Sequence, residues 1–391
     1  MATLLLICDE YIYKHNEHYY AGSQERLDFL SRYIRVFDKM KIALRCIEEK
    51  ELKSQRVIID NPKIDVVPIS IFHGPKEYFQ NYIKIGKELK DVAKGCDAAV
   101  LRLPSTVAQR AYKYIMKAGI PYATEIVFDA KDGEETSDNR IQRVLWHIID
   151  KKMKYICHNA DGVSCVTEHY LQRRYKSSKA GHFESHYSTL SLPRAFFTGP
   201  RTFDSDKVKT IAHVDLQIGL QSRKGTKEVI DALSLLKQRG IIVNAKFAGD
   251  DWDNSTKAIM DYAEEKGVHT QINCPGLLTR SQLSDFLEMA DLFVLPTRAE
   301  GLPRVIIEAI AKGLPVVTTP ASGNPELIPD HFLVNYSDVK TLANRIEELV
   351  INKKVYEEAS KTNFDHSLNY EGSLLEKRRD VFYTNLKNKC K

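Results

Sequence analysis

The 391-residue sequence predicts an α/β protein with two domains, each built on a doubly wound parallel sheet. Short apolar runs of strand length alternate with longer amphipathic stretches along almost the whole chain, which is typical of βαβ units. The chain is too long for one ordinary hydrophobic core, and the alternating pattern restarts in its second half. Two similar domains are therefore expected, with ligands beyond the carboxyl ends of their strands.

The first half contains the expected strands and helices of the first domain. Strands are expected at 3–8, 41–46, 64–69, 98–103, 121–128 and 162–167, with helices at 26–38, 106–117 and 140–158. The apolar run at the N-terminus has no basic region before it, so we interpret it as a buried strand and not a signal peptide. No window approaches about 18 consecutive apolar residues, so no membrane-spanning helix is expected.

The second half repeats the pattern after a break rich in turn-forming residues. Strands are expected at 209–214, 244–248, 271–274, 292–296, 315–319 and 332–334, with helices at 226–239, 256–266, 280–289, 303–312 and 339–352. Gly199 and Pro200 lie in the break, which lacks periodicity and predicts a linker. The expected division is a first domain over 1–195, a linker over 196–206, a second domain over 207–365 and a C-terminal helix within 366–391.

Composition excludes several classes of protein. Hydrophobic residues make up 43% and charged residues 28%, which is a globular balance. The seven cysteines form no CxxC pair, so neither a disulfide framework nor a zinc site is expected, and a reducing cytoplasm fits. The twelve histidines show no HExxH spacing, so no metal and no cofactor are predicted.

Positive charge is concentrated between 151 and 194, where eight basic residues face three acidic ones. One interpretation is a solvated helix face. The other is a patch over 151–179 for an anionic membrane surface or a pyrophosphate-linked acceptor, at the inner face of the cell membrane. Nucleic acid is not favoured, because no basic motif with interleaved aromatic residues is present.

The most informative segment runs from 292 to 329 and predicts strand, loop, helix and strand. Gly301 lacks a side chain that would block close approach, and Pro303 suits the first helical position. Backbone N–H groups at this helix start, together with the helix dipole, favour an anion such as a diphosphate. Glu308 follows in an otherwise apolar helix, where a carboxylate needs a partner. Its partner is either Lys312 one turn later or a vicinal diol such as a ribose.

This segment resembles the E-x7-E motif of retaining glycosyltransferases of family 4, which have the GT-B fold of two Rossmann-like domains. The resemblance rests on ADLFVLPTRAEGLP and EAIAKGLPVVTT, and it is narrower in the first half, where a bacterial surface-polysaccharide subgroup is the nearest likeness. It implies that Glu300 contacts the donor sugar and Glu308 the ribose. It also implies that Gly301, Leu302 and Pro303 lie beside the phosphate and sugar, and that the last helix crosses back to the first domain.

A second resemblance to the family is the sequence Arg223–Lys224–Gly225 before the helix at 226. The family's basic residue at this point neutralises the departing diphosphate, a role that the resemblance implies for Lys224. The family's Gly-Arg after the preceding strand is absent, so either Arg223 replaces that arginine or both charges are solvated. With no metal motif in the chain, cations are the expected source of this stabilisation.

Four further positions are candidates through the same resemblance. Gly249 follows a strand as in a family loop, and Leu277 and Leu278 match a turn where the nucleobase meets backbone, although core packing is their alternative role. Gly22, in the first domain, matches a loop that approaches the phosphates. These residues complete the predicted donor-binding set.

Asp129 ends an expected strand of the first domain, at a place where the family often has His or Asp near the transferring sugar. A carboxylate there would orient the acceptor hydroxyl or stabilise positive charge on the sugar. The alternative is that Asp129 only caps the next segment. The neighbouring Glu125 is as well explained by a structural role.

The function predicted from these features is a metal-independent, retaining transfer of a sugar from a nucleotide-sugar, with a UDP-sugar favoured over a GDP-sugar. The acceptor is expected to be a saccharide or a lipid-linked oligosaccharide of bacterial surface-polysaccharide synthesis. A nucleotide-sugar epimerase of the same fold, a glycosyl phosphorylase and a catalytically silent nucleotide-sugar-binding subunit are the alternatives.

Overall fold

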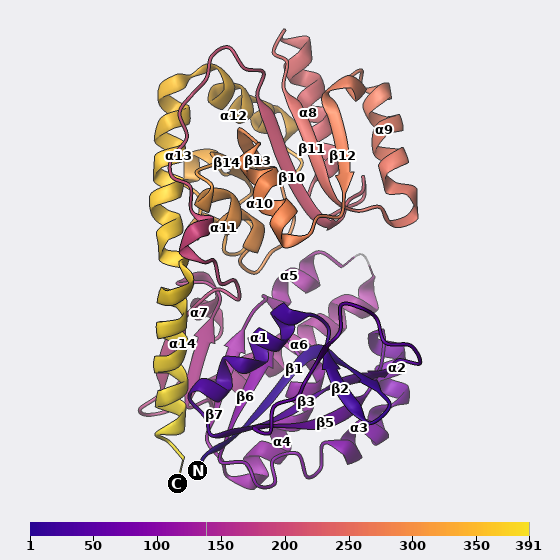
Figure 1. The fold of residues 1–391 in the computed structure, drawn as a ribbon, viewed down its shortest axis with the longest axis vertical. Helices are drawn as coiled ribbons and strands as arrows, with labels where there is room; N and C mark the ends of the chain where they lie inside the picture. The colour runs from indigo at the N-terminus through magenta and orange to yellow at the C-terminus, as the bar shows by residue number, and fades with distance from the viewer. Residues whose placement is uncertain (138, 391) are drawn as a thin grey trace. The chain divides into compact units, whose positions relative to one another are not determined.

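The computed structural model describes residues 1–137 and 139–390 and divides into two compact α/β units (Figure 1). The first unit comprises residues 1–187 and 376–391, and the second comprises 188–375. The expected linker over 196–206 belongs to the second unit. Arg201 explains why, since its backbone N–H donates to Ser360 Oγ at 2.6 Å and its Nε donates to the Lys312 carbonyl at 2.7 Å.

The first unit is built on a nine-stranded sheet that is mainly parallel. Its parallel strands, in spatial order, are β5 (Ile64–Ser70), β3 (Lys39–Glu48), β1 (Thr3–His15), β6 (Ala98–Leu103), β7 (Tyr122–Ile126), β8 (Gly162–Cys165) and β9 (Phe183–His186). The six strands expected in this half are all present. The central run of β1, Leu4 to Ile7, has no exposed surface, as expected of a strand covered on both faces.

The sheet departs from the predicted parallel pattern at one end of β1. This strand continues seven residues past its expected end at Cys8 and turns back into β2 (His18–Ala21), which pairs with it antiparallel. Asn16 occupies the turn with a φ of 54°, a left-handed conformation that asparagine tolerates. β4 (Val57–Ile58) adds a second antiparallel strand beyond β2.

Helices cover this sheet. They are α1 (Gln24–Ser31), α2 (Gly74–Gln80), α3 (Tyr82–Glu88), α4 (Thr106–Ala118), α5 (Ala130–Glu135), α6 (Arg140–His158), α7 (Tyr170–Arg174) and the greater part of α14 (Gly372–Lys387). Among them α1, α4, α6 and α14 were expected. The prediction of a helix over 26–38 is wrong in its second half, because α1 ends at Ser31 and a 3-10 turn follows. Local sequence also defines α4, since Ser105 Oγ accepts from Ala108 N at 3.0 Å at its start and Gly119 ends it at φ 67°.

The last helix packs on the first unit through a buried polar cluster around Glu125. This carboxylate lies in β7, is 5% exposed, and accepts hydrogen bonds from the hydroxyls of Tyr33, Tyr187 and Tyr383 at 2.8, 2.9 and 2.6 Å. Arg102 of β6 is its cross-strand neighbour. Tyr383 belongs to α14, so Glu125 fixes the C-terminal helix to the sheet. The structural role considered for Glu125 is therefore the one that the contacts show.

The second unit has a five-stranded, wholly parallel sheet. In spatial order its strands are β12 (Ile272–Gly276), β11 (Asn244–Asp250), β10 (Thr210–Gln217), β13 (Leu292–Leu295) and β14 (Val316–Thr318). Its helices are α8 (Thr226–Gln238), α9 (Ser255–Glu265), α10 (Arg280–Glu288), α11 (Arg304–Ala311), α12 (Val339–Ile351) and α13 (Lys353–Ser367). Five of the six expected strands and all five expected helices are present.

The strand expected at 332–334 is wrong. A 3-10 turn over Asp330–Phe332 occupies this place, and only a single bridge joins Leu333 to Thr318 of β14. Pro329 before the turn lacks the N–H that a ladder would use, which limits pairing there. α13 was not expected, because its sequence is largely polar. In the described ranges, 1–137 and 139–390, no helix is long and apolar enough to cross a membrane.

Candidate active site

The loop after β10 is held tightly against the end of β13. Gly225 is the N-cap of α8 with a φ of 84°, and a Cβ at this position would lie 2.3 Å from the Pro296 carbonyl oxygen. Any larger residue would therefore push the loop away from the strand. Ser222 Oγ donates to Asp215 and accepts from Lys224 N at 3.0 Å, which fixes the loop internally. The local sequence thus places Lys224 at the carboxyl end of the sheet.

A backbone hydrogen bond joins this loop to the one that follows β13. Arg298 N donates to the Arg223 carbonyl at 2.8 Å, and the ammonium of Lys224 then forms an ion pair with the carboxylate of Glu300. The two side chains are 15% and 11% exposed. The structure thus brings together the two residues predicted to act on the donor diphosphate and the donor sugar. Arg223 itself is exposed beside them.

The environment of Lys224 weakens its hold on a proton. Burial lowers the pKa of its ammonium to about 8, Asp215 opposes this shift, and the charge of Arg223 adds to it. An ammonium with a lowered pKa loses its proton more readily than that of an exposed lysine. A new anionic partner therefore stabilises its charged form strongly. Perturbed pKa values of this kind are frequent at functional sites.

Buried hydroxyl and amide groups hold the loop that carries Glu300. Thr318 Oγ1 donates to the Leu295 carbonyl at 2.7 Å and Thr319 Oγ1 to the Thr297 carbonyl at 2.5 Å. The Asn324 amide donates to Thr318 Oγ1 and to the Thr319 carbonyl, both at 3.0 Å. Beyond it the chain returns to the loop, since Gly323 N donates to the Gly301 carbonyl at 3.1 Å. These contacts fix the backbone that presents Glu300.

α11 starts directly beyond this loop and carries Glu308. The helix begins at Arg304 and Pro303 is its N-cap, so the expectation that Pro303 occupies the first helical position is wrong by one residue. Gly301, Leu302 and Pro303 are all buried. Glu308 is 5% exposed within α11.

Lys312 was the structural alternative as partner for Glu308, and its ammonium pairs with a different residue. Lys312 Nζ lies 3.1 Å from a carboxylate oxygen of Glu288 in α10 and 4.5 Å from the centre of the Phe196 ring. That pair joins α10 to α11 and gives Lys312 a structural role. The ribose contact predicted for Glu308 stays a prediction.

His213 is a buried residue of this site that the sequence analysis missed. It lies in β10 with no exposed surface, its Nδ1 is 2.9 Å from the Val294 carbonyl, and its Nε2 is 3.2 Å from Thr226 Oγ1. A carbonyl only accepts, so Nδ1 carries the proton and Thr226 donates to Nε2. Burial lowers the pKa of His213 to about 4. The neutral ring joins β10 and β13 to the start of α8. A histidine within an otherwise apolar strand was the sequence feature that could have identified it.

Three predicted donor contacts lie at two other strand ends of the second unit. Gly249 in β11 has a φ of 158°, and a Cβ there would meet the Asp215 carbonyl oxygen at 2.2 Å, so this glycine permits a close approach of two backbones. Leu277 is 61% exposed just after β12, which rules out the core-packing role for this side chain. Leu278 is half-buried beside it. Both leucines stay predictions as base contacts.

The remaining two candidates, Gly22 and Asp129, lie in the first unit. Gly22 follows β2, and its carbonyl accepts from Arg56 Nη1 at 3.3 Å. Asp129 is fully buried, caps α5 by accepting from Lys131 N at 3.0 Å, and pairs with Arg174 at 2.8 Å. Asp129 therefore has the capping role that was its alternative interpretation, and its role toward an acceptor stays a prediction.

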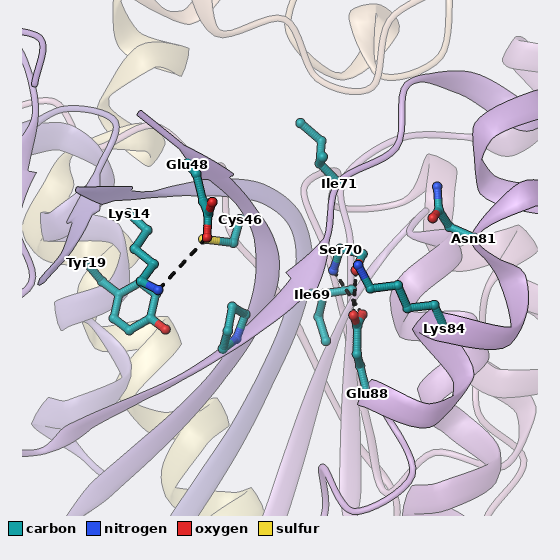
Figure 2. Close-up of a pocket in the computed structure, with 11 residues that line it drawn as sticks. Lys14, Tyr19, Cys46, Glu48, Ile69, Ser70, Ile71, Asn81, Lys84 and Glu88 are labelled. Atoms are coloured by element: carbon teal, nitrogen blue, oxygen red, sulfur yellow. Dashed lines mark hydrogen bonds and ion pairs between the residues drawn. The ribbon is translucent and has the colours of Figure 1, made fainter. Parts of the chain in front are cut away.

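The first unit also has an open pocket of about 650 Å³ at the carboxyl ends of β3 and β5 (Figure 2). Lys14 and Tyr19 line it from the β1–β2 hairpin, and Asn81 and Lys84 line it from the α2–α3 region. Glu88 is held there by Ser70, whose N–H donates to the carboxylate at 2.9 Å and whose hydroxyl donates at 2.5 Å. Lys84 has no hydrogen-bond or ion-pair partner among the described residues, so a cation is available to a ligand.

Comparison with known proteins supports a common architecture. Residues 218–365 match the family model of the glycosyl transferases group 1. Protein CapJ of Staphylococcus aureus is 24% identical over 389 residues, 98% of this chain and 92% of its own. The putative colanic acid biosynthesis glycosyltransferase WcaL of Salmonella typhimurium is 31% identical over 139 residues, 33% of this chain and 34% of its own. HepE from Anabaena in complex with UDP superposes with a TM-score of 0.67 at 17% identity, over 96% of this chain and 98% of that chain.

The two α/β units, one on a mainly parallel and one on a wholly parallel sheet, have the GT-B fold. Residues 218–365 are similar to the group 1 glycosyl transferases, and this matched segment contains Lys224, Glu300 and Glu308. The family resemblance and the fold predicted from the motifs are both confirmed.

Proposed function

We propose that the protein transfers a sugar from a nucleotide-sugar to a saccharide or lipid-linked oligosaccharide acceptor, with retention of configuration and without a metal ion. The observation that carries this proposal is the ion pair between Lys224 and Glu300 at the carboxyl edge of the second sheet. A cation and a carboxylate are the two groups needed beside a diphosphate and a sugar hydroxyl. Polysaccharide synthesis is proposed from WcaL, whose name assigns it to colanic acid biosynthesis.

The donor is proposed to be a UDP-sugar, with a GDP-sugar as the second choice. HepE, which shares this fold, is known in complex with UDP. A uracil seat near the exposed Leu277 and a ribose seat near Glu308 fit the strand ends of the second unit. Among the described residues no group of three or more His, Cys, Asp or Glu could hold a metal ion, so stabilisation of the diphosphate is proposed to come from Lys224 and Arg223.

The ion pair suggests how donor binding and catalysis are coupled. Without donor, Lys224 and Glu300 neutralise each other. A diphosphate competes for the ammonium of Lys224, which releases the carboxylate of Glu300 to accept hydrogen bonds from the donor sugar. Departure of the nucleoside diphosphate then leaves its charge beside a cation that is already in place. No residue is assigned as a covalent nucleophile, and a front-face route assisted by the departing phosphate is proposed.

The pocket of the first unit is the proposed acceptor site. Its position at the carboxyl ends of β3 and β5 is the usual one for ligands of open parallel sheets. Tyr19 and Asn81 offer groups that hydrogen-bond saccharide hydroxyls, and Lys84 offers a cation for an anionic acceptor.

Calorimetry against UDP, GDP and ADP in the presence of EDTA tests the donor site. We expect micromolar binding of UDP that Glu308→Ala abolishes or weakens at least tenfold. Thin-layer assays with the matching nucleotide-sugars, with and without a saccharide acceptor, then separate transfer from epimerisation. If no nucleotide binds, with or without magnesium, the donor site proposed here does not exist. Conversion of the donor without an acceptor would instead establish an epimerase.

A further inference from the structure

One side of helix α6 exposes an apolar stripe to solvent. Ile141, Val144, Ile148 and Tyr155 are 70%, 59%, 54% and 62% exposed. At 3.6 residues per turn these four positions fall within about one quarter of the helix circumference. Lys151 and Lys152 lie at the borders of the same stripe. A soluble surface helix normally places charged residues on this side, so the stripe requires an explanation.

Helices α4 and α3 lie beside α6 in the first unit, and α3 exposes further apolar side chains. The rings of Tyr155 and Tyr112 are 6.1 Å apart and join α6 to α4. The guanidinium of Arg110 in α4 lies 3.3 Å from the centre of the Tyr82 ring in α3. Next to Tyr82, Ile83 is 73% exposed. The three helices therefore form one face with exposed apolar residues, which we call the α3–α4–α6 face.

This face is strongly positive. The three helices carry ten lysines and arginines and only two carboxylates, Glu88 and Asp150. Both carboxylates are engaged within the first unit, Glu88 by Ser70 and Asp150 by Lys154 and Arg174. The exposed cations are Lys84, Lys87, Lys113, Lys117, Arg140, Arg143, Lys151 and Lys152.

Arg110 of α4 is a buried cation of this face, and its guanidinium stacks on the ring of Tyr82. The residue is 7% exposed, and its Nε and Nη1 have no hydrogen-bond acceptor among the described residues. A buried guanidinium without acceptors is unfavourable unless an anion lies nearby.

The basic stretch 151–179 is not by itself this surface. Lys154 pairs with Asp150 at 2.5 Å, Arg174 with Asp150 at 2.9 Å and Lys179 with Asp161 at 2.7 Å. These cations are used within the first unit. Of the predicted stretch, Lys151 and Lys152 are the members that border the apolar stripe.

We propose that the α3–α4–α6 face docks on an anionic lipid bilayer, with Ile141, Val144, Ile148 and Tyr155 entering the headgroup region and the surrounding lysines contacting lipid phosphates. An apolar stripe bordered by lysines on a helix that lies along the surface is the pattern of an interfacial helix. Docking would give the enzyme of the proposed function access to a lipid-linked acceptor, and only this purpose rests on the proposed function. A bilayer-bound enzyme and a lipid-linked acceptor would diffuse on the same membrane surface.

Sedimentation with vesicles tests the docking of the full chain. At low salt, the protein is expected to sediment with vesicles of phosphatidylcholine that contain about 30% of the anionic lipid phosphatidylglycerol. It is expected to stay in the supernatant with vesicles of pure phosphatidylcholine. Lys151→Gln with Lys152→Gln is expected to weaken partitioning roughly thirtyfold, and Ile141→Asn with Ile148→Asn is expected to weaken it at least tenfold. The matched controls are Lys257→Gln with Lys354→Gln and Ile351→Asn, which alter similarly exposed residues of the second unit and are expected to partition like wild type.

Several outcomes would overturn docking on a bilayer. They are wild-type protein that stays in the supernatant, face variants that partition like wild type, and binding that inorganic phosphate displaces at equal ionic strength. A dimer that becomes a monomer in Ile141→Asn with Ile148→Asn, measured by analytical ultracentrifugation, would assign the face to contact between copies. Calorimetry with UDP on the same variants distinguishes the donor-site proposal from the docking proposal. Variants that lose partitioning but bind UDP like wild type are altered only in docking.

Discussion

Glu125 in the first unit and Glu300 in the second are both largely buried carboxylates near strand ends, but their partners differ. Glu125 accepts hydrogen bonds from three tyrosine hydroxyls between 2.6 and 2.9 Å and has Arg102 on the neighbouring strand. Glu300 forms an ion pair with Lys224, an ammonium whose pKa burial has lowered to about 8. All the hydrogen-bond partners of the first carboxylate are buried hydroxyls of the first unit, whereas the second carboxylate has a partner for which we propose that the donor diphosphate competes.

Burial alone therefore does not distinguish a structural carboxylate from a functional one, because these two residues are both largely buried and differ in their partners. Glu125 contacts residues from three distant parts of the chain, so its loss should be felt as instability. Glu300 lies in a loop held by backbone and threonine contacts that do not involve its carboxylate. Its loss should therefore be felt in chemistry and not in folding. Four predictions test this distinction.

Glu125→Ala should lower the free energy of unfolding by about 3–5 kcal/mol, the largest effect. Three buried hydroxyls would lose their acceptor and Arg102 its cross-strand carboxylate. Urea unfolding followed by circular dichroism measures the change. Glu125→Gln, which keeps a carbonyl acceptor, should lose less. A loss below about 1 kcal/mol in Glu125→Ala would show that the cluster is not a stabilising one.

Glu300→Gln should lower turnover about 100- to 1000-fold, because a group that stabilises the transition state is lost. Its unfolding free energy should fall by less than that of Glu125→Ala, because the ammonium of Lys224, with a pKa of about 8, can release its proton when its carboxylate partner is lost. UDP should bind at least as tightly, since Lys224 is released. Steady-state kinetics with the donor found by calorimetry gives the comparison. Glu308→Ala is the matched variant, expected to raise the donor dissociation constant more than it lowers turnover. Wild-type kinetics in both variants would remove both residues from the site.

Lowering the pH should destabilise the second unit through His213. The pKa of its imidazole is about 4 in the folded protein and about 6.5 when unfolded, so the unfolded chain binds the proton more readily. The stability that the neutral ring contributes is complete above pH 6.5 and is lost as the pH falls toward 4, a change of about 3 kcal/mol. Urea unfolding at pH 7.5, 6 and 5 measures it, with His213→Gln as the variant in which this part of the slope disappears. Equal slopes in both proteins would exclude His213 as the cause.

UDP affinity should fall as the pH rises above about 8, where free Lys224 loses its proton. The expected loss is about tenfold for one pH unit above the pKa, because only the ammonium neutralises the diphosphate. Calorimetry between pH 7.5 and 9.5 in two buffers of different ionisation enthalpy should also reveal proton uptake on binding. Lys224→Arg keeps its charge throughout and should show a flat profile. A flat wild-type profile would mean that Lys224 does not meet the diphosphate.

The sequence by itself determined the fold class and the local framework of the second unit. The alternation of apolar runs and amphipathic stretches predicted ten of its eleven observed strands and helices, because each depends on local periodicity and turn residues. The segment that contains Glu300 and Glu308 carried the resemblance to the family 4 glycosyltransferases. α13 and the β2 hairpin were not predicted, since neither a polar helix nor a short antiparallel extension has a strong periodic pattern.

Only the tertiary structure decided which charged groups meet. Tyr383 reaches Glu125 across 258 residues, and Lys224 reaches Glu300 because Arg298 N bonds the Arg223 carbonyl. The same holds for the α3–α4–α6 face, whose helices are separated by strands in the sequence and adjacent in space. Periodicity reports which side of an element is buried, but contacts between elements depend on sheet order and loop geometry, which act over distances that no local pattern records.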